Sequence, residues 1–104
     1  MKQVILEKSN QKNKKYKVTM TGFPNMKPHS HHFSSRNGIT YVNGATDKQK
    51  SAWEARHKKD KGYNNIHSGI YHSNALLWNT KSLKTNIELL SKKLNAKFIV
   101  KGEL

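Results

Sequence analysis

Apolar and polar residues alternate near the start of the chain, and this two-residue period predicts β-strands. Residues 2–7 form a short apolar run. In residues 15–21, Tyr16, Val18 and Met20 share one face, while lysine and threonine occupy the other. The polar stretch SNQKNK separates the two segments. The pattern therefore predicts a β-hairpin whose apolar face is turned inward.

The next part of the sequence predicts further short strands joined by turns. Both prolines lie within residues 22–30, which we expect to form an irregular excursion. A third strand is predicted at about residues 31–35 and another at residues 39–42. Asn-Gly pairs at 37–38 and 43–44 bound the latter strand, and Asn-Gly favours tight turns because both residues tolerate positive φ.

The hydrophobic period changes to that of helices from Thr46 onward. Thr46 and Gln49 have the spacing of a capping box, so a helix is predicted over residues 47–59. Its narrow apolar strip, centred on Trp53, is expected to pack against the sheet. A short helix that begins at Ser68 or Ser73 follows.

The last predicted helix has the most regular pattern in the chain. Ser82 caps it, and its apolar residues recur on one face: Leu83, Ile87, Leu90 and Leu94. Residues 97–101, KFIVK, suit a closing strand that pairs with the N-terminal hairpin. The whole chain, residues 1–104, is therefore predicted to be one small α+β domain. It has an antiparallel N-terminal sheet with about three helices packed on one face.

The net charge adds a functional expectation to this fold. The chain carries 20 Lys and Arg against 6 Asp and Glu, a formal charge of +14 on 104 residues. A polyanion is the expected partner, since bound anions would relieve the self-repulsion of so many cations. Only Arg36 and Arg56 are arginines, which favours attraction to a phosphate backbone over readout of base edges. Abundant Lys and Asn also fit AT-rich codon usage.

Two basic segments are the candidate contacts with nucleic acid. One is the hairpin, and the other is the end of the predicted first helix, where cations also complement the helix dipole. We expect the two segments to form one surface that meets phosphates, with Trp53 anchoring the helix beneath it. The predicted anion-binding residues are Lys12, Lys14, Lys15, Lys17, Arg36, Arg56, Lys58, Lys59 and Lys61.

Aromatic residues interleave with these cations, as they do on surfaces that stack single-stranded bases. They are Tyr16, Phe33, Tyr41, Tyr63 and Tyr71. Because hydrophobic residues make up only 34% of the chain, we expect most of these rings to serve the core instead.

Six histidines raise the question of a metal site. His29 and His31 point to the same side of an extended strand, and a third ligand would have to come from elsewhere. The candidates for it are His57, His67 and His72. No carboxylate lies nearby in sequence and the spacing fits no standard metal motif. We therefore predict surface histidines, with no metal and no cofactor.

The enzyme hypothesis is a His-metal-finger nuclease. In it, His31 or His32 on a strand would act as general base, and His57 on a helix would hold a divalent ion. The second helix ligand is missing, because Lys61 stands one turn beyond His57. We therefore predict that the protein is not an enzyme.

Other classes are excluded by what the sequence lacks. The chain has no cysteine, which rules out disulfides, thiolate zinc sites and a thiol nucleophile. No apolar run approaches the roughly 20 residues that a bilayer-spanning helix needs, and no secretory signal core is seen. No contact with a membrane is expected.

Three short motifs mark the second half of the chain: ARHKK at residues 55–59, LLWN at 76–79 and SLxxNI at 82–87. With these motifs and a His-Phe strand at 32–33, the chain resembles a family of short basic proteins of unknown function from large double-stranded DNA viruses. It departs from the family at Ser34, where glycine is usual, and in the proline-containing excursion. These departures leave the strand register there open.

The resemblance implies a viral origin and a virion- or genome-associated role, in the virion and in the host cytoplasm or viral factory. It brings no catalytic residues. The leading hypothesis is a non-enzymatic virion protein that binds the phosphate backbone of nucleic acid. The alternative is a minor capsid or cement protein whose lysines meet acidic capsid surfaces.

Overall fold

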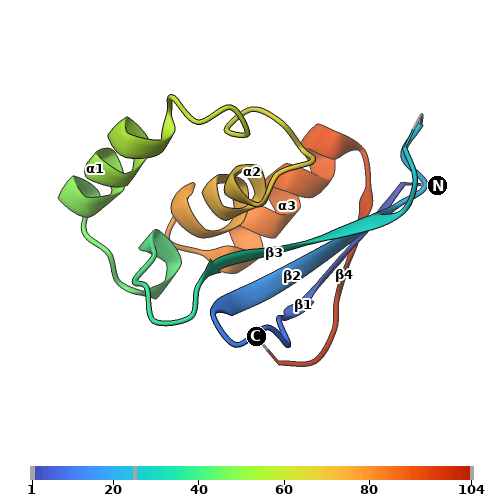
Figure 1. The fold of residues 1–104 in the computed structure, drawn as a ribbon, viewed down its shortest axis with the longest axis horizontal. Helices are drawn as coiled ribbons and strands as arrows, with labels where there is room; N and C mark the ends of the chain where they lie inside the picture. The colour runs from blue at the N-terminus through green and yellow to red at the C-terminus, as the bar shows by residue number, and fades with distance from the viewer. Residues whose placement is uncertain (1, 25, 104) are drawn as a thin grey trace.

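The computed structural model describes residues 2–24 and 26–103. A four-stranded mixed sheet carries the helices on one face, so the chain has the predicted α+β fold (Figure 1). The strands are β1 (Gln3–Lys8), β2 (Lys14–Thr21), β3 (His29–Ser35) and β4 (Lys97–Val100), in the order β3-β2-β1-β4. β2 is antiparallel to both its neighbours, whereas β4 is parallel to β1. The predicted closing strand is confirmed.

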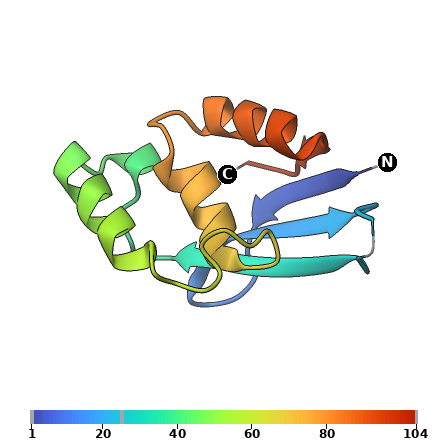
Figure 2. The same ribbon diagram turned by 90° about the horizontal axis from the view of Figure 1, so that it is seen from above.

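The helices follow the third strand along the chain. They are η1 (Tyr41–Asn43), α1 (Asp47–His57), α2 (Gly69–Ser73), the π-helical η2 (Asn74–Trp78) and α3 (Leu83–Leu94). Together α2 and η2 form one rod that crosses the sheet, and α3 lies beside it (Figure 2). Gly69 lets the rod approach closely, since a Cβ there would lie 3.2 Å from the Cβ of Phe33.

The core is a single apolar layer between sheet and helices. Alternate residues of the strands point into it, as the two-residue period predicts, and the helices meet them with leucines. The most fully buried apolar side chains are Val4, Leu6, Val18, Met20, Leu76 and Leu77. Burial of each such side chain stabilises the fold by about 1.5–3 kcal/mol.

Side-chain caps define the starts of the helices where the sequence predicts them. Thr46 and Gln49 form the predicted capping box, with hydrogen bonds of 3.1 Å and 2.8 Å. Ser68 accepts from the backbone N–H of Tyr71, and Ser82 from that of Thr85. Of the two predicted starts for the short helix, Ser68 is therefore the one used.

Two local predictions are wrong. The segment at 39–42 is not a strand: the backbone N–H of Thr40 donates to Asn43 Oδ1 at 2.6 Å, which closes the 3-10 turn of η1. α1 ends at His57 and does not rest on the sheet. Its one buried residue, Trp53, stacks on Trp78 with ring centroids 4.9 Å apart, so α1 lies beyond the end of the sheet (Figure 1).

A buried amide connects α3 to the rod. Asn86 is fully buried, and its Nδ2 donates to the carbonyl oxygens of Leu76 and Thr80 at 2.8 Å and 3.1 Å. Its Oδ1 accepts from the backbone N–H and the hydroxyl of Thr80 at 3.0 Å and 2.6 Å. Every hydrogen-bonding group of the amide is paired. Asn86 therefore sets the turn between η2 and α3.

We predict that Asn86→Ala lowers the free energy of unfolding by about 3 kcal/mol, because it leaves buried peptide groups unpaired. Urea denaturation measures this loss. Thr85→Ala, at the exposed neighbouring position, is the control and should change stability by less than about 0.5 kcal/mol. Equal effects of the two substitutions would contradict the role given to Asn86.

Ser34 adopts a backbone conformation that favours glycine. Its φ is 68°, in the left-handed region where a Cβ is strained. The register of β3 against β2 nevertheless runs regularly on both sides, from Lys14 opposite Ser35 to Met20 opposite His29. The serine therefore adds strain without shifting the strand.

We predict that Ser34→Gly raises the free energy of unfolding by about 0.5–1 kcal/mol, because glycine adopts positive φ without strain. Thermal and urea unfolding would measure the gain. Ser35→Gly, one residue further along the same strand, should instead lower stability by a similar amount. A loss of stability in Ser34→Gly would contradict this interpretation.

Candidate nucleic-acid interface

Cations gather around the β1–β2 turn. Lys12 and Lys14 are exposed there, and the Lys15 ammonium donates to the carbonyl of Gly38 at 3.1 Å. Arg36 follows β3, and its Nη2 donates to the carbonyl oxygens of Gln11 and Ser9 at 2.8 Å and 3.3 Å. The guanidinium group is therefore held against the turn, and the structure brings Arg36 to the predicted hairpin lysines.

A hollow at this end of the sheet adds a cation that sequence reasoning missed. Lys8, Lys15 and Arg36 line it together with Ser9 and Tyr16, around a volume of about 290 Å³. Three positive side chains and two hydroxyl groups around one depression make a suitable site for a phosphate group. Lys8 lies at the end of β1, and only the antiparallel pairing places it beside Tyr16.

Lys17 extends this basic end onto the open face of the sheet. Along β2, residues 15, 17 and 19 alternate with the core residues, and no helix covers their face (Figure 2). Lys17 is flanked in register by Glu7 on β1 and His32 on β3. We name the residues Lys8, Lys12, Lys14, Lys15, Lys17 and Arg36 the hairpin surface.

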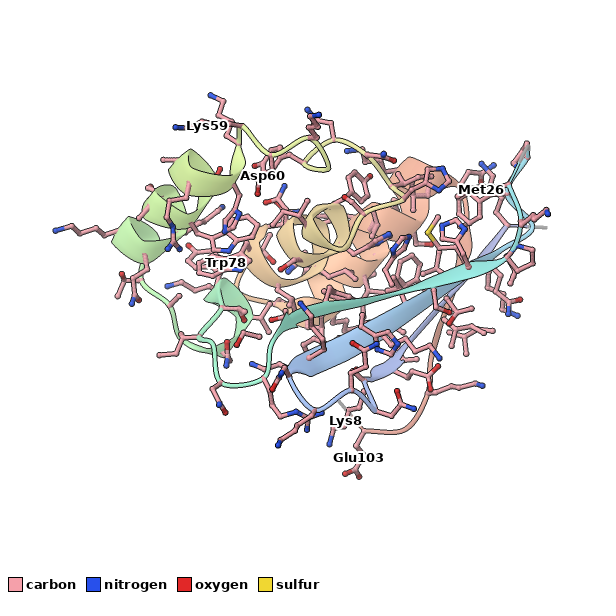
Figure 3. The ribbon with its side chains drawn as sticks, viewed as in Figure 1. Lys8, Met26, Lys59, Asp60, Trp78 and Glu103 are labelled. Atoms are coloured by element: carbon pink, nitrogen blue, oxygen red, sulfur yellow. The ribbon has the colours of Figure 1, made fainter. Side chains whose placement is uncertain are left out.

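The second predicted group lies at the C-terminal end of α1. Arg56, Lys58, Lys59 and Lys61 are all exposed there. Trp53 anchors the helix as predicted, although against Trp78 and not the sheet. Figure 3 places Lys59 and Lys8 at opposite edges of the molecule. The structure therefore does not join the two groups into one surface, because α1 packs beyond the end of the sheet.

The described Lys and Arg residues of both groups form no ion pair, although Glu7 lies opposite Lys17 and Glu54 borders the same depression as Lys58 and Lys59. In the part of the chain that the structure describes, the one ion pair within 4.0 Å joins His57 Nδ1 to Asp60 Oδ2, at 2.8 Å. No Lys or Arg of this part has a carboxylate within that distance. With 20 Lys and Arg against 6 Asp and Glu in the chain, these few carboxylates leave a net positive charge.

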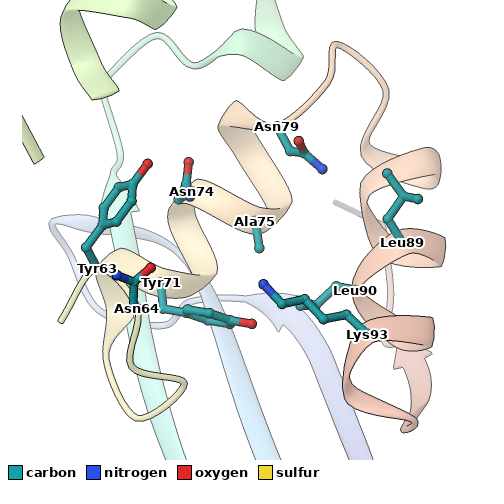
Figure 4. Close-up of a pocket in the computed structure, with 9 residues that line it drawn as sticks. All are labelled: Tyr63, Asn64, Tyr71, Asn74, Ala75, Asn79, Leu89, Leu90 and Lys93. Carbon is teal, nitrogen blue, oxygen red and sulfur yellow. The ribbon is translucent and has the colours of Figure 1, made fainter. Parts of the chain in front are cut away.

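A third feature, absent from the sequence predictions, is a hollow of about 180 Å³ (Figure 4). It lies between the rod, α3 and the loop that precedes α2. Lys93 reaches across it from α3, with its ammonium 5.5 Å from the centre of the Tyr71 ring. Polar groups of Tyr63, Asn64, Asn74 and Asn79 line it together with the apolar side chains of Ala75, Leu89 and Leu90. Tyr63 also borders a second depression that contains Lys58 and Lys59. These segments are far apart in sequence, so no pattern indicated the hollow.

The aromatic residues serve mainly the core, as predicted. Phe33 and Tyr71 are buried, and Tyr16 packs 5.8 Å from Phe33. Tyr41 lies between the ammonium groups of Lys50 and Lys81, at 4.9 Å and 5.5 Å from its ring centre. Its hydroxyl donates to Asp47, and this hydrogen bond raises the pKa of Tyr41.

Four histidines from two segments form a cluster. His29 and His31 project from β3 as the alternation predicts, and their ring centroids are 4.9 Å apart. His67 stacks on His29 at 4.9 Å, and His72 on His31 at 6.0 Å. His57 is not part of this cluster, since its described ring contacts are with Trp53 and Asp60. The strand and helix histidines of the nuclease hypothesis are thus not brought together.

Burial makes two of these histidines hard to protonate. His72 is fully buried, and desolvation lowers its pKa from 6.5 to about 4, despite a hydrogen bond of 2.8 Å to the Ile66 carbonyl. Desolvation also lowers the pKa of His31, with a smaller contribution from His29 and His67. Both rings are neutral at pH 7.

Within residues 2–24 and 26–103, no group of three or more His, Asp or Glu side chains is arranged to hold a metal ion as it stands. None of the helices described is long and apolar enough to cross a bilayer.

Comparison with protein-family models, with curated proteins and with solved structures finds no match to this chain.

We predict that acid destabilises the protein through His72. Below pH 6.5 the unfolded chain takes up a proton that the folded chain accepts only near pH 4. The free energy of unfolding is therefore highest above pH 6.5 and falls by up to about 3 kcal/mol as the pH approaches 4. Urea unfolding at pH 7.5 and pH 4.5 measures the difference.

Two variants separate the contribution of His72 from that of carboxylate titration, which the wild type and both variants have in common. His72→Phe keeps an aromatic ring but cannot take up the proton, so the difference between the two pH values should shrink. Thr85→Ala, which removes no titratable group, should leave the difference unchanged. A pH dependence in His72→Phe as large as that of the wild type would contradict the assignment.

Proposed function

We propose that this protein is a small, non-enzymatic, virion-associated protein that binds the phosphate backbone of nucleic acid. The observation that carries the proposal is the uncompensated charge: a formal +14 on 104 residues, with no Lys or Arg of the described residues paired to a carboxylate. Lysines that form no ion pair are free to displace counterions from a polyanion, which is the main source of sequence-independent affinity. The viral context rests on the resemblance carried by ARHKK, LLWN and SLxxNI.

The hairpin surface is the proposed main contact. It combines exposed lysines on a turn with the hollow lined by Lys8, Lys15 and Arg36, where a phosphate oxygen would meet three cations. The Arg36 guanidinium is already held by two carbonyl groups, so less conformational entropy is lost on binding. The predominance of lysine favours binding that is insensitive to sequence.

The α1 end is the proposed second contact. Because Lys8 and Lys59 lie at opposite edges of the molecule, the two basic groups face different directions (Figure 3). A protein with two such groups can bind two separate stretches of polyanion at once. This arrangement suits a protein that compacts the genome or bridges it to an acidic surface in the particle.

Salt-dependent gel-shift titration with duplex DNA, single strands and RNA tests the proposal. The triple variant Lys8→Gln, Lys12→Gln, Lys14→Gln should weaken binding about equally on all sequences. It should also reduce the slope of log affinity against log salt by about two to three, since each phosphate contact contributes about 0.9.

The matched control carries the same loss of charge elsewhere. Lys84→Gln, Lys92→Gln, Lys97→Gln alters exposed residues of α3 and β4 and should leave the salt slope nearly unchanged. Equal losses in the two triple variants would show that only net charge matters and would contradict the hairpin surface. Binding to an acidic protein but not to nucleic acid would overturn the proposed function in favour of a minor capsid or cement role.

A further inference from the structure

The histidine cluster contains a pair of ring nitrogens that face each other. His29 lies at the start of β3 and His67 in the loop before α2, and the distance from His29 Nε2 to His67 Nδ1 is 3.2 Å. His67 is held in place by its backbone N–H, which donates to Asn65 Oδ1 at 2.9 Å. Two segments distant in sequence thus present imidazole nitrogens to one point.

Hydrogen bonding determines which nitrogen of His29 carries the lone pair. Its Nδ1 lies 2.9 Å from the carbonyl oxygen of Lys27, which can only accept, so Nδ1 is the protonated donor. Nε2 is therefore unprotonated and faces His67. A histidine whose other ring N–H donates to a backbone carbonyl is the usual arrangement of a metal ligand in proteins.

The separation of the two nitrogens fits a shared metal ion. Zinc binds histidine nitrogen at about 2.0–2.1 Å in tetrahedral geometry, so two such ligands lie about 3.3 Å apart. The observed 3.2 Å agrees with this value. A hydrogen bond from His67 to His29 would give a similar distance, so the third neighbour decides between the two arrangements.

That neighbour is His31. Its ring lies 4.9 Å from that of His29, centre to centre, and its Nε2 is buried without a hydrogen-bond partner among the described residues. Behind it, the fully buried His72 donates from Nε2 to the Ile66 carbonyl, and its Nδ1 likewise has no described partner. Buried polar atoms in native proteins are seldom left unpaired, and a metal ion would satisfy such a lone pair.

We propose that His29, His67 and His31 bind one Zn²⁺ ion, with the fourth position open to water. His29 and His67 already have ligand spacing, and His31 joins them by turning its ring, since the three do not converge as they stand. His72 supports His31 from the core side. The ligands are neutral and the protein is strongly basic, so the site is weaker than a structural zinc site built from thiolates.

Zinc at this site would join β3 to the loop before α2, and it would compete with protons for the ring nitrogens. One equivalent of Zn²⁺ should therefore raise the melting temperature at pH 7.5, and the increase should become smaller as the pH is lowered, because protons compete with the metal for the same ring nitrogens. This inference is independent of the proposed binding to nucleic acid.

The experiment is titration of the full chain with ZnCl₂ by isothermal calorimetry at pH 7.5, combined with thermal unfolding. The wild type should bind one equivalent, and His29→Gln and His67→Gln should each lose most of this affinity. The control is His57→Gln, which removes the histidine paired with Asp60, the competing surface site, and should bind like the wild type. Circular dichroism checks that each variant is folded.

A second measurement uses only the wild-type protein, so it does not depend on the folding of any variant. In ¹⁵N NMR spectra of the imidazole rings, Zn²⁺ should shift His29 Nε2, His67 Nδ1 and His31 Nε2, and leave His32 unchanged. No saturable binding, binding that survives the loss of both His29 and His67, or shifts confined to His57 would each overturn the proposal.

Discussion

A single apolar layer between one sheet and one row of helices supports this molecule, and the shortage of apolar residues determines its shape. With hydrophobic residues at 34% of the chain, only one face of the sheet is covered. The other face carries the half-buried Lys15, Lys17 and Thr19, and no helix covers it. A folded chain with +14 charges must place them at its surface and keep them apart, because self-repulsion opposes compactness.

The second constraint is the stacking of two tryptophans. Trp53 is the one buried residue of α1, and its ring lies nearly parallel to that of Trp78, at 12°. This contact holds α1 at the end of the rod and away from the sheet. The cations at the end of α1 are thereby separated from those of the hairpin, so one predicted surface becomes two. The distribution of charge, and with it the proposed bridging of two polyanion stretches, depends on this single packing contact.

Two buried polar side chains, Asn86 and His72, fix how the helices pack where the thin apolar core does not. Asn86 pairs with Leu76 and Thr80 and sets the angle at which α3 meets the rod. His72 fills the space between β3 and α2, a position where its protonation is strongly disfavoured. Both groups make the fold more specific than leucine packing alone would. His72 also stacks on His31 and so belongs to the histidine cluster.

The local structure of this protein is largely determined by its sequence. The alternation in residues 15–21, the capping box at Thr46 and the apolar face from Leu83 to Leu94 each depend on neighbours within a few residues, and each predicted its element correctly. The strand predicted at residues 39–42 does not form, because the Thr40–Asn43 hydrogen bond outweighs a weak β-propensity. Only the tertiary structure decided that Arg36 and Lys8 belong to the hairpin surface and that Lys58 and Lys59 lie apart from it. It also decided that His67 contacts His29. These juxtapositions come from strand pairing and from the packing of one indole, which are contacts between distant residues that no local period encodes.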